Sequence, residues 1–318
     1  MSETTSSAEL EALSDYARQA ISEGSKSFAG ASRLFRSDMR ASAQLLYAWC
    51  RHCDDVIDGQ VAGFKDEGAT QEDIAERLSL LRTQTQRAID GKADSPAFAA
   101  LAYVVKRHEI PARFPFELLD GFEMDAIGHH YKSIDDTILY SYYVAGVVGV
   151  MMAMIMGVRD DEVLDRACDL GIGFQLTNIS RDVMDDWNIG RVYLPQDWLD
   201  EMGVPRDNVG APKSRVPVFK VVDRLLDTAE SYYDSAYFGI GELPFRAACA
   251  ISTARRVYRE IGRQVRYRQH TAWDSRTVVT KPKKYAGACL AVIDSTYAHT
   301  LGRLSRPPAR TGLWTRAR

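Results

Sequence analysis

The sequence has few of the residues that mark a disulfide-rich, collagenous or disordered protein. Its 318 residues include five cysteines, 11 prolines and 22 glycines, which excludes a disulfide scaffold and a low-complexity chain. Alternating strand-like patterns are nearly absent, and no internal repeat is present. With 46% hydrophobic residues, the chain can bury a large core. We therefore predict one all-helical domain over residues 1–318, with flexible tails near 1–6 and 304–318.

The first ten residues, MSETTSSAEL, have neither the basic segment nor the apolar segment of a signal peptide. An odd number of cysteines in a chain of this length favours free thiols in a reducing cytoplasm. Cys50 and Cys53 form a C-x-x-C pair, but no second ligand pair follows at zinc-finger spacing. We therefore expect a cytoplasmic protein without a zinc site.

Charge is unevenly distributed around a net value of −3. From Arg246 onward the chain is strongly basic, and its only acids are Glu260, Asp274 and Asp294. The acidic majority of the chain argues against a nucleic-acid partner, whereas a basic end suits a phosphorylated substrate or anionic lipid. We predict peripheral contact of the basic C-terminal tail with the cytoplasmic membrane face.

Residues 139–158 (LYSYYVAGVVGVMMAMIMGV) carry no charge and are long enough to cross a bilayer. Three tyrosines, several glycines and the absence of a second such segment favour the other interpretation, a helix buried at the centre of a bundle. Apolar periodicity and end signals such as Ser95-Pro96 predict the remaining helices. The expected helices are 7–23, 37–60, 71–90, 96–109, 115–129, 135–157, 160–188, 217–240, 243–269 and 276–303.

The first acidic segment is LLYAWCRHCDDVIDG. Asp54 and Asp58 are four residues apart and so share one helix face. Arg51 precedes Asp54 by three residues, and Tyr47 precedes Arg51 by four. One stripe of the helix is therefore expected to carry a phenol, a guanidinium and two carboxylates.

The second acidic segment is GFQLTNISRDVMDDWNIGR. Gln175, Asn178, Asp182 and Asp186 follow one another at spacings of three, four and four, and Arg181 lies beside them. Clustered carboxylates repel by about 0.2–0.5 kcal/mol per pair on an exposed helix, and by more when buried. Magnesium removes this repulsion, because it prefers oxygen ligands and often binds a few carboxylates together with substrate phosphates. Two such faces looking at each other would hold a diphosphate through shared metal ions.

Spacing alone is weak support, because Asp161, Asp165 and Asp169 repeat the same interval. Asp169 precedes Asn178 by nine residues, which is about half a turn around the helix at ~100° per residue. This third run therefore points away from the second acidic segment, and we expect it to be a solvated face.

Five blocks resemble the squalene/phytoene synthase family, and most closely its bacterial phytoene synthases. They are GSKSF (24–28), LYAWCRHCDDVID (46–58), YVAGVVG (143–149), QLTNISRDVMDDWNIGRVYLP (175–195) and ARRVYREI (254–261). The resemblance implies the class I isoprenoid (terpenoid) synthase fold, a helical bundle around a central cavity. It also implies the condensation of two identical prenyl diphosphates through a cyclopropyl diphosphate intermediate.

The resemblance also assigns roles to individual residues. The implied metal ligands are Asp54, Asp58, Asn178, Asp182 and Asp186. The implied diphosphate-binding residues are Ser25, Ser27, Tyr47, Arg51, Gln175, Asn178, Arg181, Tyr258 and Arg276. The implied catalytic residues are the four aspartates of the two motifs with Tyr47 and Arg51. The implied cavity lining is Tyr140, and the small residues Ala145, Gly149 and Ala153 of the uncharged helix are expected to leave room for the prenyl chains.

Loss of diphosphate from an allylic carbon leaves a carbocation and a highly charged leaving group. Prepositioned metal ions and guanidinium groups stabilise the negative charge that develops, and Arg51 and Arg181 suit bidentate contacts with phosphate oxygens. The cation must be kept from water beside aromatic faces. Phenylalanine at Gly149 or Ala153 should therefore impair use of a twenty-carbon substrate more than use of a fifteen-carbon one.

The expected reaction joins two geranylgeranyl diphosphates, via prephytoene diphosphate, into phytoene and releases two diphosphates, as in carotenoid biosynthesis. The expected cofactor is Mg2+, or Mn2+ in its place, as two or three ions bound with diphosphate, without a nicotinamide. One alternative is a squalene or dehydrosqualene synthase that uses farnesyl diphosphate. Another is a non-catalytic relative that acts as an assembly protein, which the retained aspartates disfavour. A monomer or weak homodimer is expected.

Overall fold

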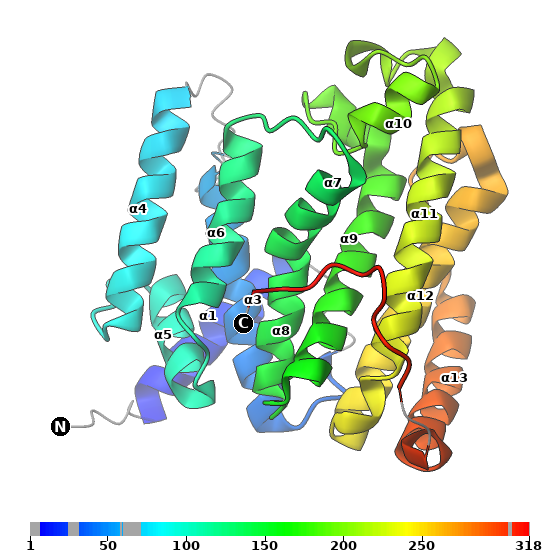
Figure 1. Ribbon diagram of the computed structural model, residues 1–318. Coiled ribbons are helices and arrows are strands. Elements are labelled where there is room, and N and C mark those ends of the chain that lie inside the picture. The colour runs from blue at the N-terminus through cyan, green and yellow to red at the C-terminus, as the bar shows by residue number, and fades with distance from the viewer. Residues whose placement is uncertain (1–6, 25–31, 58, 60–70, 305–306, 318) are drawn as a thin grey trace. The chain divides into compact units, whose positions relative to one another are not determined.

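The computed structural model describes residues 7–24, 32–57, 59, 71–304 and 307–317. The chain divides into two compact units, which are described separately. The first runs to Ile127 and includes Met154–Gly157; the second comprises Gly128–Ala153 and Val158 onward. Every regular element of the described residues is a helix (Figure 1), which confirms the predicted fold class.

Five α-helices belong to the described residues of the first unit. They are α1 (Ser7–Gly24), α3 (Ser37–Ile57), α4 (Gln71–Ile89), α5 (Pro96–His108) and α6 (Arg113–Ala126). Helix α3 contacts each of the other four, and its Leu45, Leu46 and Trp49 are fully buried. Because these apolar residues face inward, the opposite stripe of α3 with Tyr47, Arg51 and Asp54 remains partly exposed.

End signals in the sequence place two of these helices. Pro96 occupies the first turn of α5 after an extended Ser95, as the sequence predicts. Helix α4 ends at Gly91, whose φ of 76° is left-handed, and the amide of Lys92 donates to the Arg87 carbonyl across this turn at 2.7 Å.

The second unit is built around α9 (Asp161–Asn188), which packs against α11 (Arg215–Tyr237) and α12 (Phe245–Arg268). It also contains α7 (Ile134–Ser141), a π-helical turn η2 (Tyr142–Gly146), α8 (Val147–Ile155), whose last two residues belong to the first unit, α10 (Gln196–Glu201) and α13 (Lys281–His299). Short 3₁₀ turns are η3 (Arg206–Asn208), η4 (Pro212–Ser214), η5 (Ile240–Glu242), η6 (Gln269–Thr271) and η7 (Leu301–Leu304). Figure 1 shows α9, α11 and α12 as long neighbouring helices, with α13 beside α12.

The predicted uncharged helix is the run α7–η2–α8. Ile134–Ile155 is long and apolar enough to cross a membrane by composition, but 61% of its most apolar window is buried inside the protein. Its small residues bring it close to α9, because a Cβ at Gly149 would collide with the Ala167 carbonyl and one at Gly171 with the Ala145 carbonyl. The predicted buried helix is therefore the one observed.

The aspartates at 161, 165 and 169 were expected to form a solvated face, and this was wrong for Asp165 and Asp169, although Asp161 is exposed. Asp169 is fully buried and Asp165 is 3% exposed. The chain returns at its C-terminal end and places two arginines on them. Arg310 donates to both oxygens of Asp169 at 2.7 and 2.8 Å, and Nε of Arg316 lies 2.8 Å from Asp165 Oδ1.

The prediction of a frayed C-terminal tail was wrong for the same reason. Residues 307–317, here called the C-terminal strap, are held by more than ion pairs. The Trp314 ring packs on Tyr142 with centroids 4.2 Å apart, and the Trp314 amide donates to the Tyr232 hydroxyl at 3.1 Å. Arg166, itself buried, donates to the Pro308 carbonyl at 2.8 Å. The strap therefore belongs to the folded second unit.

Several arginines of α12 are paired with neighbouring helices. Arg256 forms a bidentate pair with Asp294 of α13 at 2.6 and 2.7 Å. Arg266 donates to Asp223 of α11 at 2.8 Å, and Arg255 is buried with its Nε on the Tyr233 carbonyl. These cations join α12 to its neighbours.

The observed helix ends lie within a few residues of the predicted ones, with two exceptions. The last helix begins at Lys281 rather than 276, because Arg268 binds the Ser275 carbonyl and the Thr277 hydroxyl and holds the preceding segment as a loop. Helix α10 lies between the expected helices 160–188 and 217–240 and was not predicted.

Candidate active site

The first acidic stripe lies on α3 in the first unit. The Arg51 guanidinium bridges two carboxylates, with Nη1 at 3.0 Å from Asp54 Oδ2 and Nη2 at 2.5 Å from Asp55 Oδ1. The side chains of Arg51 and Asp54 are 38% and 42% exposed. Arginine and carboxylates are thus gathered on one accessible helix face, as the spacing predicts.

Tyr47 lies one turn earlier on this stripe. Burial raises the pKa of its hydroxyl, Arg51 lowers it, and Asp54 raises it again, with a net upward shift. The phenol therefore stays protonated at neutral pH and can donate a hydrogen bond to an anionic oxygen.

The neighbouring thiols are free, as predicted. Burial raises the pKa of Cys50 to about 12 and that of Cys53 well above its usual value. A protonated thiol is a poor metal ligand, so this pair has the properties of packing residues.

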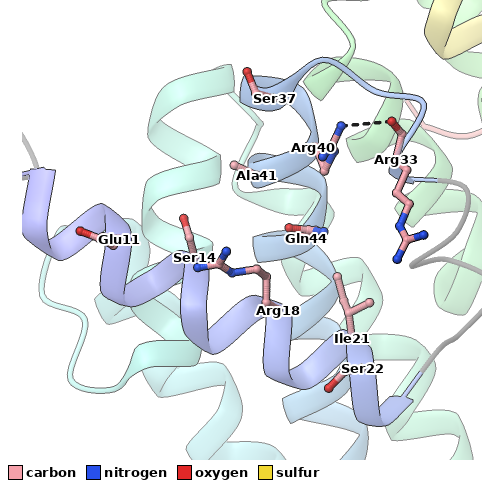
Figure 2. Close-up of a pocket in the computed structure, with 10 residues that line it drawn as sticks. All are labelled: Glu11, Ser14, Arg18, Ile21, Ser22, Arg33, Ser37, Arg40, Ala41 and Gln44. Atoms are coloured by element: carbon pink, nitrogen blue, oxygen red, sulfur yellow. Dashed lines mark hydrogen bonds between the residues drawn. The ribbon is translucent and has the colours of Figure 1, made fainter.

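A pocket of about 640 Å3 lies between α1 and the start of α3 (Figure 2). Ser37, Arg40, Ala41 and Gln44 of α3 line one side, and Gln44 precedes Tyr47 by three residues, so the pocket continues the acidic stripe toward the helix N-terminus. Arg40 donates to the carbonyls of residues 32, 33 and 35 at 3.1–3.2 Å. This polar pocket does not have the character of the apolar cavity that the family resemblance implies.

The second acidic stripe lies on α9 in the second unit. Arg181 Nε donates to Asp182 Oδ1 at 2.7 Å, and its Nη2 pairs with the other oxygen of the same carboxylate. The two side chains are only 15% and 19% exposed. Burial lowers the pKa of Arg181, but the hydrogen bond and the charge of Asp182 raise it by more. The net shift is upward, so the guanidinium stays charged.

Asn178 and Gln175 precede this pair on the same face. Asn178 Nδ2 donates to Gln175 Oε1 at 3.3 Å, whereas its Oδ1 is buried without a hydrogen-bond partner among the described residues. A buried carbonyl oxygen of this kind is costly unless a ligand satisfies it. Together with the carboxylates of Asp182 and Asp186, it forms an all-oxygen donor set that fits a hard divalent cation.

Tyr258 of α12 covers this face. Its ring stacks on Phe174, with centroids 4.1 Å apart and planes inclined by 25°. Burial is the main cause of its raised pKa, the Arg181 charge opposes it, and Asp182 adds to it. Phe174 was not predicted as a site residue, although it precedes Asn178 by four positions and this spacing could have identified it.

The end of α9 that carries Asp186 is held by the two loops that follow. A Cβ at Gly210 would overlap the Trp187 ring, so this ring packs directly on the 206–214 segment. Trp273 Nε1 donates to the Ser180 carbonyl at 3.1 Å. Trp273 belongs to the loop 272–280, and the predicted diphosphate ligand Arg276 is exposed on this loop. The role of Arg276 stays a prediction.

Tyr140 lies in a buried cluster of aromatic rings. It stacks on Tyr193 with centroids 4.7 Å apart, and Tyr131 meets both rings edge-on at 5.4–5.5 Å. Tyr131 and Tyr193 were not predicted, because they flank α7 and α9 and only the fold brings them together. The rings pack on one another, and the role of Tyr140 in lining a cavity for the prenyl chains stays a prediction.

The wall residues Ala145, Gly149 and Ala153 have different surroundings. Gly149 faces the α9 backbone, and the carbonyl of Ala145 meets Gly171, so both serve helix packing. Phenylalanine at Gly149 would separate the helices, and Gly149 is therefore unsuitable as a test of chain length. Ala153, 3% exposed, remains suitable for that test.

Three predicted residues, Ser25, Ser27 and Asp58, lie outside the described residues. Within the part of the chain that is described, no group of three or more His, Cys, Asp or Glu side chains could by itself hold a metal ion. The donor set on α9 includes an amide oxygen in place of a third such side chain.

The helical fold and these stripes define the isoprenoid synthase class. The squalene/phytoene synthase family model matches residues 21–284, and the chain belongs to this family. It is 48% identical to a phytoene synthase of Pseudescherichia vulneris over 96% of this chain and 98% of the relative. It is 46% identical to a 15-cis-phytoene synthase of Pantoea ananas over the same shares.

Solved structures agree with the fold. A dehydrosqualene synthase in complex with ligand superposes with a TM-score of 0.78 at 26% identity, covering 89% of this chain and 96% of that one. The squalene synthase HpnC from Alicyclobacillus acidocaldarius gives 0.74 at 24% identity, covering 84% and 97%. The predicted isoprenoid synthase fold is thereby confirmed.

Proposed function

We propose that this chain is a prenyltransferase of the phytoene synthase type, which condenses two geranylgeranyl diphosphates into phytoene. The observation that carries the proposal is the stripe of Asn178, Arg181 and Asp182 under Tyr258, with its buried amide oxygen that lacks a partner in the described chain. Near-full-length similarity to 15-cis-phytoene synthases supports the choice of substrate and product.

Asn178, Asp182 and Asp186 on α9, with Asp54 on α3 and Asp58, which lies outside the described residues, would hold magnesium. A bound divalent cation supplies Lewis-acid stabilisation of the diphosphate leaving group. The all-oxygen donors of the α9 stripe suit magnesium, or manganese in its place, better than zinc or copper. Two or three ions bound together with diphosphate remain part of this proposal.

The protein's own cations and phenols complete the leaving-group site. Carboxylates hold Arg181 and Arg51 in place. Their remaining N–H groups can donate charge-assisted hydrogen bonds to phosphate oxygens. The protonated hydroxyls of Tyr47 on α3 and Tyr258 on α12 can each donate a hydrogen bond to an anionic oxygen. The buried rings of Tyr140 and Tyr193 offer their faces to a cation and exclude water from it.

A chain-length limit follows from the wall helix. Ala153→Phe should reduce turnover of geranylgeranyl diphosphate more than that of farnesyl diphosphate, because the longer chain needs the extra volume. Steady-state kinetics with both substrates measure this ratio, and equal losses on both would reject the assignment of Ala153 to the wall.

The deciding experiment incubates purified protein with each diphosphate, with and without Mg2+ and NADPH, and identifies the hydrocarbon. Phytoene from the twenty-carbon substrate, formed with Mg2+ and without NADPH, is the expected result. Asp54→Ala with Asp182→Ala should lower kcat by at least about 100-fold, given what a lost charge-stabilising group costs. Squalene or dehydrosqualene as the main product would favour the farnesyl alternative, and hydrocarbon from the double variant would contradict the mechanism.

The protein would act in the cytoplasm, as a monomer or weak homodimer, in peripheral contact with the membrane that holds its substrate and product. Its free thiols are consistent with that compartment. An active enzyme of this type needs neither a nicotinamide nor a nucleic acid.

A further inference from the structure

Helix α13 packs on α12 through one narrow side. Ala291, Ser295 and Ala298 are its buried residues, and Asp294 on the margin of that side is bound by Arg256. The hydroxyl of Ser295 meets that of Ser252 at 3.3 Å. Helix α13 also contacts the short turns η5 and η7, and most of its remaining surface is exposed in the described part of the chain.

The opposite side of α13 is exposed and apolar. From Tyr285 to Leu301, no exposed side chain carries a charge. The residues recur at intervals of three and four, so they form one continuous face. This α13 apolar face consists of Tyr285 (71% exposed), Cys289, Leu290 (45%), Val292 (47%), Ile293 (64%), Tyr297 (47%) and Leu301 (59%), with the uncharged Thr296 and Thr300 exposed among them.

An exposed apolar stripe of this length is unusual on a water-facing helix and marks an interaction surface. Cations flank it at both ends. Lys281 is exposed at its start. Near its end, the Phe245 ring lies 5.5 Å from His299, and Arg246 is exposed next to Phe245.

The acids near this face are few and mostly neutralised. Asp294 is bound by Arg256, and Glu260 is bound by Lys283 at 2.5 Å, while Glu242 is exposed beside the Arg246 end. The face itself has no acid. A second copy of the chain would therefore find no carboxylate there to pair with its own Lys281, whereas anionic lipid headgroups would supply that charge.

We propose that the α13 apolar face docks on an anionic lipid surface, with the helix parallel to the membrane plane. Tyrosines and aliphatic side chains enter the headgroup–acyl boundary, and the flanking cations meet the headgroups. The inference rests on the proposed function, since a C40 hydrocarbon must leave the enzyme for a lipid phase. It also replaces the predicted role of the tail, because Arg310 and Arg316 are engaged by α9 aspartates.

The test is co-sedimentation of the full-length protein with vesicles of phosphatidylcholine, with or without phosphatidylglycerol, in the absence of substrate. The wild type should bind the anionic vesicles, more weakly at high salt. Ile293→Asp should lower the partition coefficient between vesicles and water by at least about tenfold, because an aliphatic side chain that would be buried in the membrane is replaced by a charge. Leu80→Asp on α4, where Leu80 is 52% exposed, is the matched control and should bind as the wild type does.

Two further readouts identify the face and the charge. Cys289 should react with a maleimide in solution and be protected on vesicles. Lys281→Glu should reduce the difference in bound protein between anionic and neutral vesicles. The proposal fails if the wild type does not bind, if Leu80→Asp loses as much as Ile293→Asp, or if Cys289 stays reactive on vesicles. It also fails if the wild type is a dimer that does not bind vesicles and the only effect of Ile293→Asp is to dissociate that dimer.

Docking and catalysis can fail separately. Hydrocarbon formation in detergent micelles by a protein that ignores vesicles would overturn the docking proposal alone. Vesicle binding through the α13 apolar face by a protein that makes no hydrocarbon would overturn the proposed function alone.

Discussion

Removal of one buried guanidinium, in Arg316→Leu, should destabilise the second unit strongly. The Arg316 side chain is 1% exposed and its Nε lies 2.8 Å from Asp165 Oδ1, whose own side chain is 4% exposed. It also pairs with Asp161. Leucine would leave the Asp165 carboxylate buried beside an apolar group, without its 2.8 Å partner and with Arg310 at the longer distance of 3.4 Å.

Breaking a buried ion pair by removing one partner costs about 3–5 kcal/mol. The C-terminal strap can also detach, which would let water reach Asp165, so the observed loss cannot exceed the free energy with which the strap docks. In Arg316→Leu with Asp165→Leu, no buried charge lacks its partner at this position. The double variant should therefore recover a large part of the stability.

The assay is urea unfolding followed by circular dichroism, with limited trypsin digestion to detect a detached strap by cleavage after Arg310. The control is Arg87→Leu, which breaks a 2.9 Å pair with Asp94 whose side chains are 51% and 33% exposed. It should cost at most about 1 kcal/mol. If Arg316→Leu costs no more than this control, and its C-terminal strap is cleaved no faster than that of the wild type, the buried Arg316–Asp165 pair does not stabilise the second unit.

Two further predictions concern the site and the thiols. Gly210→Ala should destabilise the protein by about 1–3 kcal/mol and lower kcat, because the added Cβ would overlap the Trp187 ring beside Asp186. The control is Gly287→Ala on α13, whose Cβ would meet nothing nearer than 3.9 Å. It should leave the melting temperature unchanged or raise it. An equal effect of the two substitutions would contradict the packing argument. Maleimide at neutral pH should modify exposed Cys289 and leave Cys53 unmodified, because Cys53 is fully buried and burial raises its pKa well above the usual value, which keeps it a thiol. Mass spectrometry of the digested protein measures this, and rapid labelling of Cys53 would contradict its burial.

The sequence by itself determined the helices and the chemistry of the stripes. Periods of three and four residues place Tyr47, Arg51 and Asp54 on one face whatever the helix packs against, because this follows from helix geometry alone. The same holds for Asn178 and Asp182. Pro96 at a helix start and Gly91 after a helix end act through local backbone geometry, and both ends were predicted correctly.

The tertiary structure decided which charges are buried and which apolar residues are exposed. Asp165 and Asp169 have the same spacing as the site aspartates, yet they are covered by Arg310 and Arg316, about 140–150 positions further along the chain. Periodicity carries no information about such a distant partner, since a helix face is specified locally and its neighbour is specified by the whole fold. The exposure of the apolar side of α13 was not predictable for the same reason, because the sequence pattern does not show which side of the helix α12 covers.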